Sequence, residues 1–231
     1  MINIIKAQEN NIWEKGVQVL KDKLEKANRE GKRSLLFLSG GSAVFLYLKL
    51  AEILEKLEIR SDNLAVSQVD ERFQPEISEN INAKNIEETG LIEKLSLKKI
   101  PFYQIPQSGT LRETAFNFDK LLKKLFGIYN YKIAVLGIGK DGHTAGLLRG
   151  YKSEWNKDRF AVGFENRGAF KERITITPKV FAMLDYGLVC VSGIEKREMV
   201  ERILNKASDD VNNLPGLLIH KIKEADLVRD I

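Results

Sequence analysis

A histidine and a carboxylate stand close together among glycines in the second half of the chain. His143 follows Asp141 by two positions and is one of only two histidines in the 231 residues. Imidazole accepts a proton near neutral pH, and a nearby carboxylate can orient the ring or stabilise the imidazolium. We therefore interpret His143 as a candidate general base and Asp141 as its partner. The other histidine, His220, follows an apolar run, which is typical of a residue packed in a helix.

A glycine- and serine-rich segment could bind a phosphate group. It consists of Ser39, Gly40, Gly41 and Ser42. Glycine lets a ligand approach the backbone closely, and the free amides at the start of a following helix favour an anion. An ordinary turn from a strand to a helix has the same composition, so both interpretations stay open. The segment lacks the Gly-Lys-Ser/Thr ending of a nucleotide-binding P-loop.

Three charged residues follow another apolar run directly. They are Asp70, Glu71 and Arg72. The planar guanidinium of Arg72 could bind a phosphate through two parallel hydrogen bonds. Asp70 or Glu71 would then orient other groups or a substrate hydroxyl. A solvated turn is the alternative interpretation of the same three residues.

Other chemistries have weaker support. Gly137, Gly139 and Gly142 match the spacing of a dinucleotide-binding loop, but that loop needs a longer helix than this sequence offers next. Two histidines and the single cysteine, Cys190, argue against a zinc site, because zinc sites in proteins are built mainly from these residue types. The Gly-x-Ser-x-Gly elbow of serine esterases is absent from the sequence.

Apolar runs and amphipathic stretches alternate along the chain and must position these residues. Strands are predicted over residues 34–38, 64–69, 100–105, 132–136, 161–164, 173–177 and 187–191. Helices are predicted over residues 43–57, with Ser42 as the N-cap, and over 85–95, 111–126, 194–204 and 217–222. This alternation predicts an α/β fold, a three-layer sandwich with a mainly parallel, Rossmann-like sheet flanked by helices on both faces. Ligands of such sheets bind beyond the carboxyl ends of the strands, where segments 39–42, 70–73 and 137–144 fall.

Length and composition narrow the functional class. A chain of 231 residues is expected to form one domain, residues 1–231. The net charge of +5 is spread along the chain without a basic block, so nucleic acid is not an expected partner. One cysteine, no signal peptide and no apolar run of membrane-spanning length favour a cytoplasmic protein without a membrane partner. A monomer and a homodimer both stay open.

Together these segments resemble the 6-phosphogluconolactonase family, within the superfamily that includes glucosamine-6-phosphate deaminase. The resemblance extends over residues 38–42, 70–73, 136–145, 173–177, 193–196 and 214–215. It implies hydrolysis of 6-phospho-D-glucono-1,5-lactone to 6-phosphogluconate in the pentose phosphate pathway, without a metal or organic cofactor. It implies further that His143 activates water and that Arg72 and Lys196 hold the phosphate with residues 39–42. Arg173 is a further candidate for the same pocket.

The sequence departs from the family pattern at two places. The family usually continues Ser-Leu-Phe-Pro-Gly after Ala145, where this chain has residues 146–150, Gly-Leu-Leu-Arg-Gly. The family also has a Ser-Asn pair after the Asp-Glu-Arg segment, and here Glu79 and Asn80 occupy that neighbourhood, followed by Ile81 and Asn82. Contacts to the sugar ring, and therefore the exact substrate, stay open at this point.

Two alternatives to a lactonase are considered. Glucosamine-6-phosphate deaminases resemble this chain in the Asp-Gly-His segment, but they have Tyr where this chain has Arg72. They also have Glu five residues after the histidine, where this chain has Leu148, which cannot carry a proton. A non-catalytic sugar-phosphate-binding protein on the same fold is the other alternative. The presence of His143 favours an enzyme, because binding a phosphate does not require it.

Overall fold

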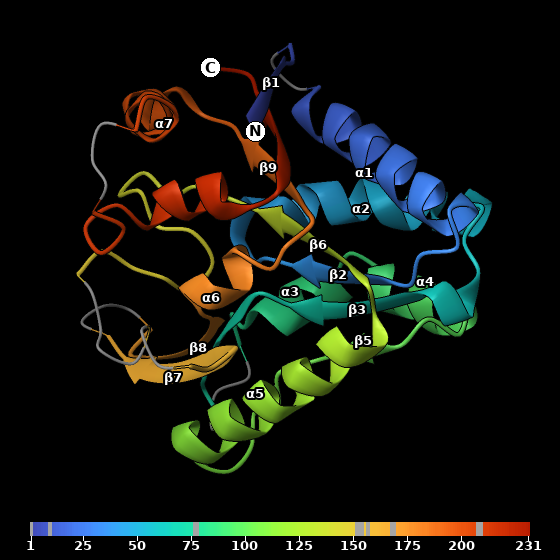
Figure 1. Cartoon of the computed structure of the whole chain (residues 1–231), viewed down its shortest axis with the longest axis horizontal. Coiled ribbons are helices and arrows are strands. Elements are labelled where there is room, and N and C mark those ends of the chain that lie inside the picture. Colours follow the sequence, from blue (N-terminus) through green and yellow to red (C-terminus); the bar gives the residue numbers. More distant parts are fainter. Residues whose placement is uncertain are drawn as a thin grey trace.

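A parallel sheet of seven strands forms the centre of the molecule (Figure 1). The computed structural model describes residues 2–8, 11–75, 79–150, 155, 158–166, 170–206 and 210–231. In spatial order the strands are β1 (Ile2–Lys6), β10 (Glu224–Arg229), β9 (Tyr186–Val191), β6 (Tyr131–Leu136), β2 (Ser34–Leu38), β3 (Leu64–Gln68) and β5 (Phe102–Tyr103). Strands β2, β3 and β9 are buried along their whole length. Continuous burial explains why they read as apolar runs, as strands covered on both faces do.

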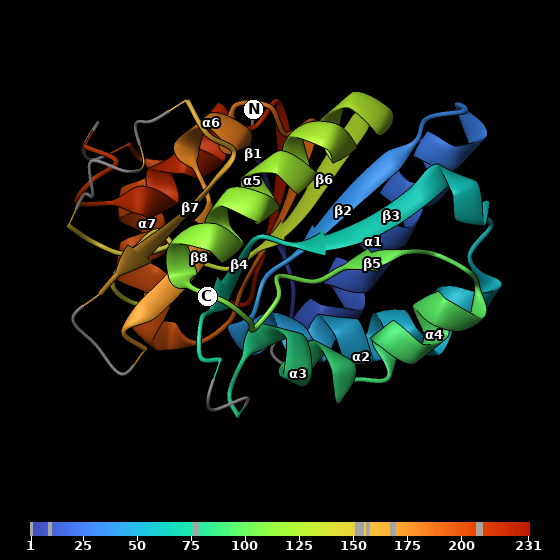
Figure 2. The ribbon, with the colours of Figure 1, turned by 90° about the horizontal axis from the view of Figure 1, so that it is seen from below.

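Helices cover both faces of this sheet (Figure 2). One face carries α1 (Ile12–Arg29), α2 (Val44–Ile53), α3 (Asn82–Glu87) and α4 (Leu91–Leu97). The other carries α5 (Leu111–Ile128), α6 (Pro178–Phe181), α7 (Arg197–Leu204) and the 3-10 segment Pro215–Lys221. Side chains of β2 alternate between the two cores, with Leu35 and Phe37 in one and Leu36 and Leu38 in the other. The predicted three-layer α/β sandwich is confirmed.

A smaller antiparallel sheet adjoins the first one. It has the order β4 (Asp70–Arg72), β8 (Glu172–Ile176) and β7 (Ala161–Glu165). The chain passes from one sheet to the other at Val69, whose N–H donates to Leu38 O at 2.9 Å and whose carbonyl accepts from Ile176 N at 2.8 Å. The alternative interpretation of Asp70, Glu71 and Arg72 as a solvated turn is therefore wrong, because this backbone is extended and paired with β8.

Several helix boundaries differ from the prediction. Ser42 does not cap a helix, because it lies inside a 3-10 turn, Gly41–Ala43, and α2 begins only at Val44. The predicted helix over 85–95 is two helices, separated at Gly90, whose φ of +76° is left-handed. The predicted helix over 217–222 is the 3-10 segment Pro215–Lys221. Elements β1, α1, α6 and β10 were not predicted.

The order of the strands creates a crevice beside β2. From β2 the chain continues to β3 on one side, whereas from β6, the other neighbour of β2, it returns to the large sheet at β9 on the opposite side. Such a switch point separates the loops that follow the two strands and is where open α/β sheets bind ligands. No helix in the described part of the chain is both long enough and apolar enough to cross a membrane.

Candidate active site

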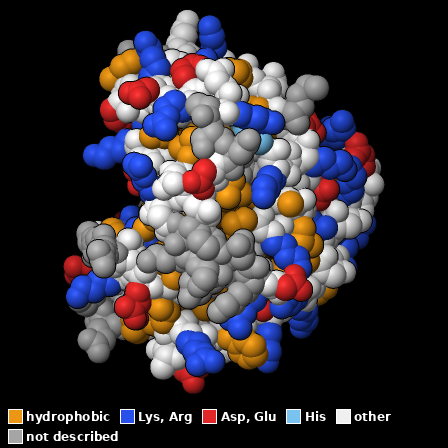
Figure 3. Space-filling view, turned by 60° about the vertical axis from the view of Figure 1, so that its left-hand side comes forward, with side chains coloured by type: hydrophobic (Ala, Val, Ile, Leu, Met, Phe, Trp, Pro, Cys, Tyr) orange, Lys and Arg blue, Asp and Glu red, His pale blue; other side chains and the backbone are white. Residues whose placement is uncertain are grey.

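A cavity of about 310 Å³ lies at this switch point. It is lined by Ser39, Gly40, Gly41, Ser42, Asp70, Arg72, Asn82, Gly137, Ile138, Gly139, His143, Ala145, Arg173 and Lys196. The candidate residues of the sequence line this cavity except Glu71 and Asp141, and Asp141 contacts His143 instead. On the face shown in Figure 3, a His side chain lies beside Lys and Arg side chains. The loops after β2 and β6 thus meet β4 and β8 around one space.

The His143 ring is held by Asp141. His143 Nδ1 lies 2.5 Å from Asp141 Oδ1, and the His143 N–H donates to the same oxygen at 3.2 Å. A proton on Nδ1 satisfies this carboxylate and leaves the lone pair on Nε2, the nitrogen that a general base needs free. The ring is 38% exposed, so solvent reaches it. The pair is thus arranged for proton transfer at Nε2.

Gly139 allows this pair to form. A Cβ atom on Gly139 would lie 2.1 Å from His143 Nδ1 and 2.7 Å from Asp141 Oδ1, so any side chain there would displace the ring. The loop is closed by two hydrogen bonds of 2.9 Å, from Gly139 N to His143 O and from Gly142 N to Gly139 O. Gly139 therefore makes room for the His143–Asp141 pair, whereas a Cβ atom on Gly142 would meet Leu214 and Met199.

We expect the Asp141–His143 pair to stabilise the fold in a defined pH range. The hydrogen bond from His143 lowers the pKa of Asp141 from its ordinary 3.8 to about 2. A carboxyl with a lowered pKa in the folded state contributes stability above about pH 4, and this contribution disappears as the pH falls through about 2. The difference in melting temperature between the wild type and Asp141→Asn should therefore shrink between pH 4 and pH 2.

Thermal melts at several pH values measure this difference. Burial raises the pKa of both Asp70 and Glu71, which gives a pH dependence of opposite sign. Both groups are present in the two proteins, so the comparison cancels their contribution. A difference in melting temperature that stays constant from pH 4 to pH 2 would contradict the pairing.

Two arginines lie side by side on neighbouring strands of the small sheet. Arg72 of β4 and Arg173 of β8 are directly opposite in the antiparallel register. Like charges in opposite positions destabilise a sheet, unless an anion lies between them. The guanidinium Cζ atom lies 4.0 Å from the centroid of the Phe170 ring in Arg72 and 5.7 Å from it in Arg173. The arrangement gives the cavity two adjacent cationic groups.

Neither guanidinium has all its donors paired with described groups of the protein. The Nε atoms of Arg72 and Arg173 are buried and bond no described group. Arg72 Nη1 donates to Asn80 O at 2.5 Å, and Arg173 Nη1 lies 3.7 Å from Asp70 Oδ2. Burial lowers the pKa of Arg72, and the charge of Arg173 lowers it further. An anionic ligand would oppose both effects, because a nearby negative charge raises the pKa of a guanidinium.

The loop after β2 adds further groups that suit an anion. Ser39 is 5% exposed, and its Oγ is buried without a hydrogen-bond partner among the described groups. Its carbonyl accepts a hydrogen bond from Tyr47 OH at 2.9 Å, which fixes the loop to α2. Gly41 has a left-handed φ of +65°, which turns the chain into the 3-10 turn. Lys196, the last residue of the 3-10 turn Ile194–Lys196, lines the cavity as well.

Asp70 lines the cavity, but Glu71 does not. Asp70 is 5% exposed, and burial raises its pKa, although Arg173 and His143 oppose that shift. Glu71 is completely buried, and all its contacts are within the protein. Its carboxylate accepts from Gln68 Nε2 at 2.7 Å and from three backbone N–H groups, those of Arg72, Asn82 and Ala83, at 2.8, 2.6 and 2.8 Å. Glu71 thus orients other groups of the protein, as one of the two expectations had it, and the expectation that it orients a substrate hydroxyl is wrong.

Replacing Glu71 with alanine should destabilise the fold strongly. The substitution leaves three backbone donors and the Gln68 amide without their acceptor, and each unsatisfied buried donor costs about 1–3 kcal/mol. Because water can fill part of the space, we expect a loss of about 3 kcal/mol in the free energy of unfolding. Urea denaturation measures it. Glu87→Ala, at an exposed position of α3, is the matched control and should change stability by less than about 0.5 kcal/mol. Equal stability of the two variants would contradict this role.

Sequence reasoning missed several residues of the cavity. Asn82 at the start of α3 lines it, whereas Asn80, which was matched to the family's Ser-Asn pair, does not. Ala145 also lines it, with a left-handed φ of +50° in the turn closed by the Leu147 N to Thr144 O bond of 3.0 Å. Asp70 and Asn82 are twelve positions apart in the sequence, and no local spacing indicates that both line one cavity. Within the described residues, no three His, Cys, Asp or Glu side chains form a group that could hold a metal ion.

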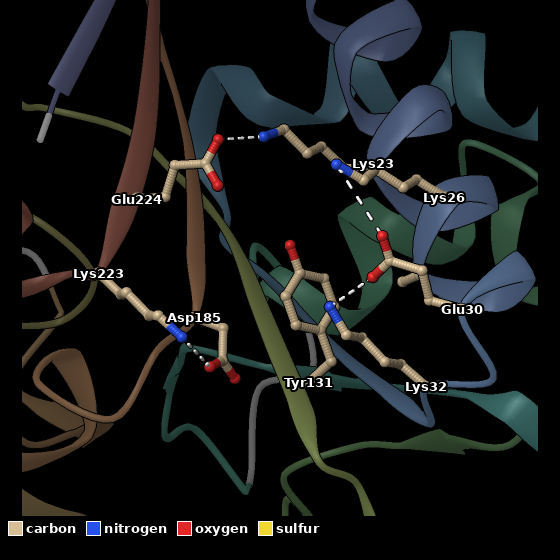
Figure 4. Close-up of a pocket in the computed structure, with 9 residues that line it drawn as sticks. Lys23, Lys26, Glu30, Lys32, Tyr131, Asp185, Lys223 and Glu224 are labelled. Atoms are coloured by element: carbon tan, nitrogen blue, oxygen red, sulfur yellow. Dashed lines mark hydrogen bonds and ion pairs between the residues drawn. The ribbon is translucent and has the colours of Figure 1, made fainter.

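A second hollow lies at the opposite edge of the sheet (Figure 4). It measures about 170 Å³ and is lined by residues of α1 and by residues at the amino ends of β6, β9 and β10. Its charges pair with one another: Lys23 with Glu224, Lys26 and Lys32 with Glu30, and Lys223 with Asp185. The four lysines of this hollow thus share three carboxylates, whereas the first cavity has Arg72, Arg173 and Lys196 against one carboxylate in its lining, Asp70.

Comparisons with known proteins identify relatives of this chain. A protein of Oryza sativa subsp. indica named "Probable 6-phosphogluconolactonase 4, chloroplastic" is 27% identical over 190 residues, which cover 77% of this chain and 58% of the rice protein. The chain thus spans somewhat more than half the length of that relative. A protein of Mesorhizobium japonicum named 6-phosphogluconolactonase is 26% identical, with 76% of this chain and 74% of that protein covered.

Solved structures show the same fold. The crystal structure of 6-phosphogluconolactonase from Thermotoga maritima superposes with a TM-score of 0.82 at 22% identity and covers 99% of both chains. A monomeric glucosamine-6-phosphate deaminase superposes with a TM-score of 0.73 at 15% identity, covering 98% of this chain and 96% of that one. Residues 7–228 match the family model described as glucosamine-6-phosphate isomerases/6-phosphogluconolactonase. Because this match extends over nearly the whole sequence, the chain belongs to the glucosamine-6-phosphate isomerase/6-phosphogluconolactonase family.

Proposed function

We propose that this chain is an enzyme that hydrolyses 6-phospho-D-glucono-1,5-lactone to 6-phosphogluconate. The observation that carries the proposal is one cavity that contains a carboxylate-bound imidazole and two adjacent guanidiniums. A phosphorylated lactone needs both kinds of group, one for the anion and one for the carbonyl. The names of the relatives in rice and Mesorhizobium support the same reaction.

The phosphate would bind among the cationic groups. Within the described part of the chain, Arg72 Nε–H, Arg173 Nε–H and the Ser39 hydroxyl have no hydrogen-bond partner, and Lys196 adds a positive charge. The backbone amides at the start of the 3-10 turn Gly41–Ala43 add neutral donors, as the first turn of a helix does for anions. A phosphate there separates the two facing guanidiniums and satisfies them together. The phosphate site thus fixes one end of the substrate.

His143 would act on the other end. Its Nε2 accepts a proton from a water molecule while the water oxygen bonds to the C1 carbonyl carbon. The tetrahedral intermediate then collapses, the bond between C1 and the ring oxygen breaks, and the imidazolium returns its proton to that oxygen. Asp141 keeps Nδ1 protonated throughout and stabilises the transient imidazolium, since its lowered pKa keeps it ionised at neutral pH. The step consumes one water molecule and yields the open-chain acid.

A glucosamine-6-phosphate deaminase is the competing proposal, because the family includes it and a solved deaminase shares the fold. Ring opening in that family uses a Glu five residues after the histidine, where this chain has Leu148. Leu148 cannot carry a proton and does not line the cavity. This favours the lactonase. A cytoplasmic location and a place in the pentose phosphate pathway are parts of the same proposal.

One experiment with the wild-type protein separates the two reactions. Fresh 6-phospho-D-glucono-1,5-lactone and glucosamine 6-phosphate are offered in parallel, and acid formation and ammonia release are recorded. We expect acid formation well above the spontaneous rate and no ammonia. Ammonia release without lactone hydrolysis would overturn the proposal in favour of the deaminase, and activity on neither would favour a binding protein.

A further inference from the structure

Asn82 connects three segments of the cavity wall, although it contributes no charge. Asn82 is the first residue of α3 and is only 3% exposed. Its backbone N–H donates to Glu71 Oε1 at 2.6 Å, and its Nδ2 donates to the carbonyl of Asp70 at 3.1 Å. The side chain is thus fixed on the strand that also carries Arg72.

The same side chain lies against the loop that follows β2. A Cβ atom placed on Gly40 would lie 2.0 Å from Asn82 Oδ1, 2.4 Å from Cγ and 2.8 Å from Nδ2. The φ of Gly40 is −86°, which side chains adopt without strain, so its backbone conformation does not require glycine. Gly40 must be glycine because the Asn82 amide occupies the space that a side chain would fill.

The contact links the two halves of the phosphate site. Gly40 stands between Ser39 and Gly41, whose hydroxyl and backbone suit an anion, while Asp70 begins the strand that ends at Arg72. An amide bonded to one side and packed against the other fixes the distance between them. A displacement of about 1 Å in a positioned group can cost about 10²-fold in rate or binding.

We infer that Asn82 is a positioning residue that sets the spacing between the 39–42 loop and Arg72 for phosphate binding. The inference rests on the proposed function, because it assigns both sides of that spacing to the substrate phosphate. Asn82 acts through Gly40 and Asp70 and takes no part in proton transfer at His143.

The first test compares Asn82→Ala with the wild type on two substrates. For 6-phospho-D-glucono-1,5-lactone we expect KM to rise about 10–100-fold, while kcat changes less than about threefold. For unphosphorylated D-glucono-1,5-lactone we expect kcat/KM to change less than about threefold, because that substrate does not use the spacing. Lys84→Ala, at an exposed position of the same helix, is the matched control and should leave all values unchanged.

The second test uses the collision between residues 40 and 82. Gly40→Ala alone should raise the KM for the phosphorylated lactone about 10-fold or more, because the new methyl group displaces the Asn82 amide. All three atoms that this methyl group meets first belong to the Asn82 side chain beyond Cβ. Adding Gly40→Ala to Asn82→Ala should therefore raise KM less than about twofold further. Non-additivity of this kind is the signature of a direct contact.

Two results would overturn the inference. One is a loss in the double variant that equals the product of the two single losses. The other is an equal loss of kcat/KM on both lactones in Asn82→Ala, which indicates a general loss of folded enzyme. If the wild type hydrolyses neither lactone, the proposed function fails separately from this inference. Calorimetric titration with 6-phosphogluconate then compares the wild type, the two single variants and the double variant by their binding affinities. If that titration detects no binding, the positioning role fails with the phosphate site, even where melting temperatures still show the contact.

Discussion

Replacing His143 with alanine is expected to lower kcat for 6-phospho-D-glucono-1,5-lactone about 10²–10⁴-fold, the usual contribution of a general base. The substitution removes the nitrogen that accepts the proton from water. No other histidine is among the described residues that line the cavity. The substitution leaves Arg72, Arg173 and Lys196 in place, so affinity for 6-phosphogluconate should change less than about threefold. Steady-state hydrolysis and calorimetric titration measure the two quantities.

The control for this variant is the other histidine. His220 Nε2 lies 2.8 Å from the Ile203 carbonyl, away from the cavity lining, and His220→Gln should keep kcat within about twofold of the wild type. Lactones also hydrolyse slowly without an enzyme, so the spontaneous rate must be subtracted in every assay. Lactone hydrolysis by His143→Ala at the wild-type rate would remove His143 from the role of base.

Replacing Arg72 with alanine is expected to weaken 6-phosphogluconate binding about 10–100-fold. A hydrogen bond to a charged group contributes about 1.5–3 kcal/mol, and each 1.4 kcal/mol corresponds to a factor of ten in Kd. The backbone N–H of residue 72 still donates to the Glu71 carboxylate in the variant. Glu71 therefore stays in place to accept the N–H of Asn82 at the start of α3. Unphosphorylated gluconate, which lacks the group that Arg72 binds, should bind as it does to the wild type.

Two further variants sharpen the Arg72 prediction. Arg72→Lys restores the charge but not the planar fork, so it should recover only part of the affinity. Arg60→Ala removes an exposed arginine that pairs with Asp62 far from the cavity lining, and it should leave binding unchanged. Equal losses for the phosphorylated and unphosphorylated ligands in Arg72→Ala would contradict the assignment of Arg72 to the phosphate.

The central layer could be predicted because burial on both faces leaves a clear trace in a sequence. Strands β2, β3 and β6 read as largely apolar runs, and each leads into a segment that contributes residues to the cavity lining. Carboxyl ends of parallel strands share one edge, so grouping these residues needed no knowledge of the loops. For the same reason Arg72 and His143, far apart in the sequence, were expected in one pocket, and the structure brings both to its lining.

Strand β4 was not predicted, because its residues are charged. Its residues have the composition of a solvated turn, yet Asp70 and Glu71 are buried. The donors that satisfy Glu71 come from its own neighbour, from Gln68 and from the backbone of α3, which begins eleven residues later. No local sequence pattern indicates a hydrogen-bond partner that lies eleven residues away. The structural role of Glu71 therefore could not be distinguished from the role of Asp70 by sequence alone.

The N-terminal and C-terminal elements illustrate two further causes of failure. Helix α1 has apolar residues at helical spacing, including Leu20, Leu24 and Ala27, and a periodicity search over that segment would have found it. Strand β10 lies between β1 and β9, so its place depends on pairing with the first strand of the chain. Pairing at so large a sequence separation has no local signal.

The most direct test of the account is a crystal structure of the wild-type protein with 6-phosphogluconate, the stable product of the proposed reaction. We predict that the phosphate lies within hydrogen-bond distance of the Arg72 and Arg173 guanidiniums and of Ser39 Oγ. We predict also that the C1 carboxylate lies beside His143 Nε2, within the reach of one water molecule. A ligand bound with its phosphate at His143, or outside this cavity, would contradict the account.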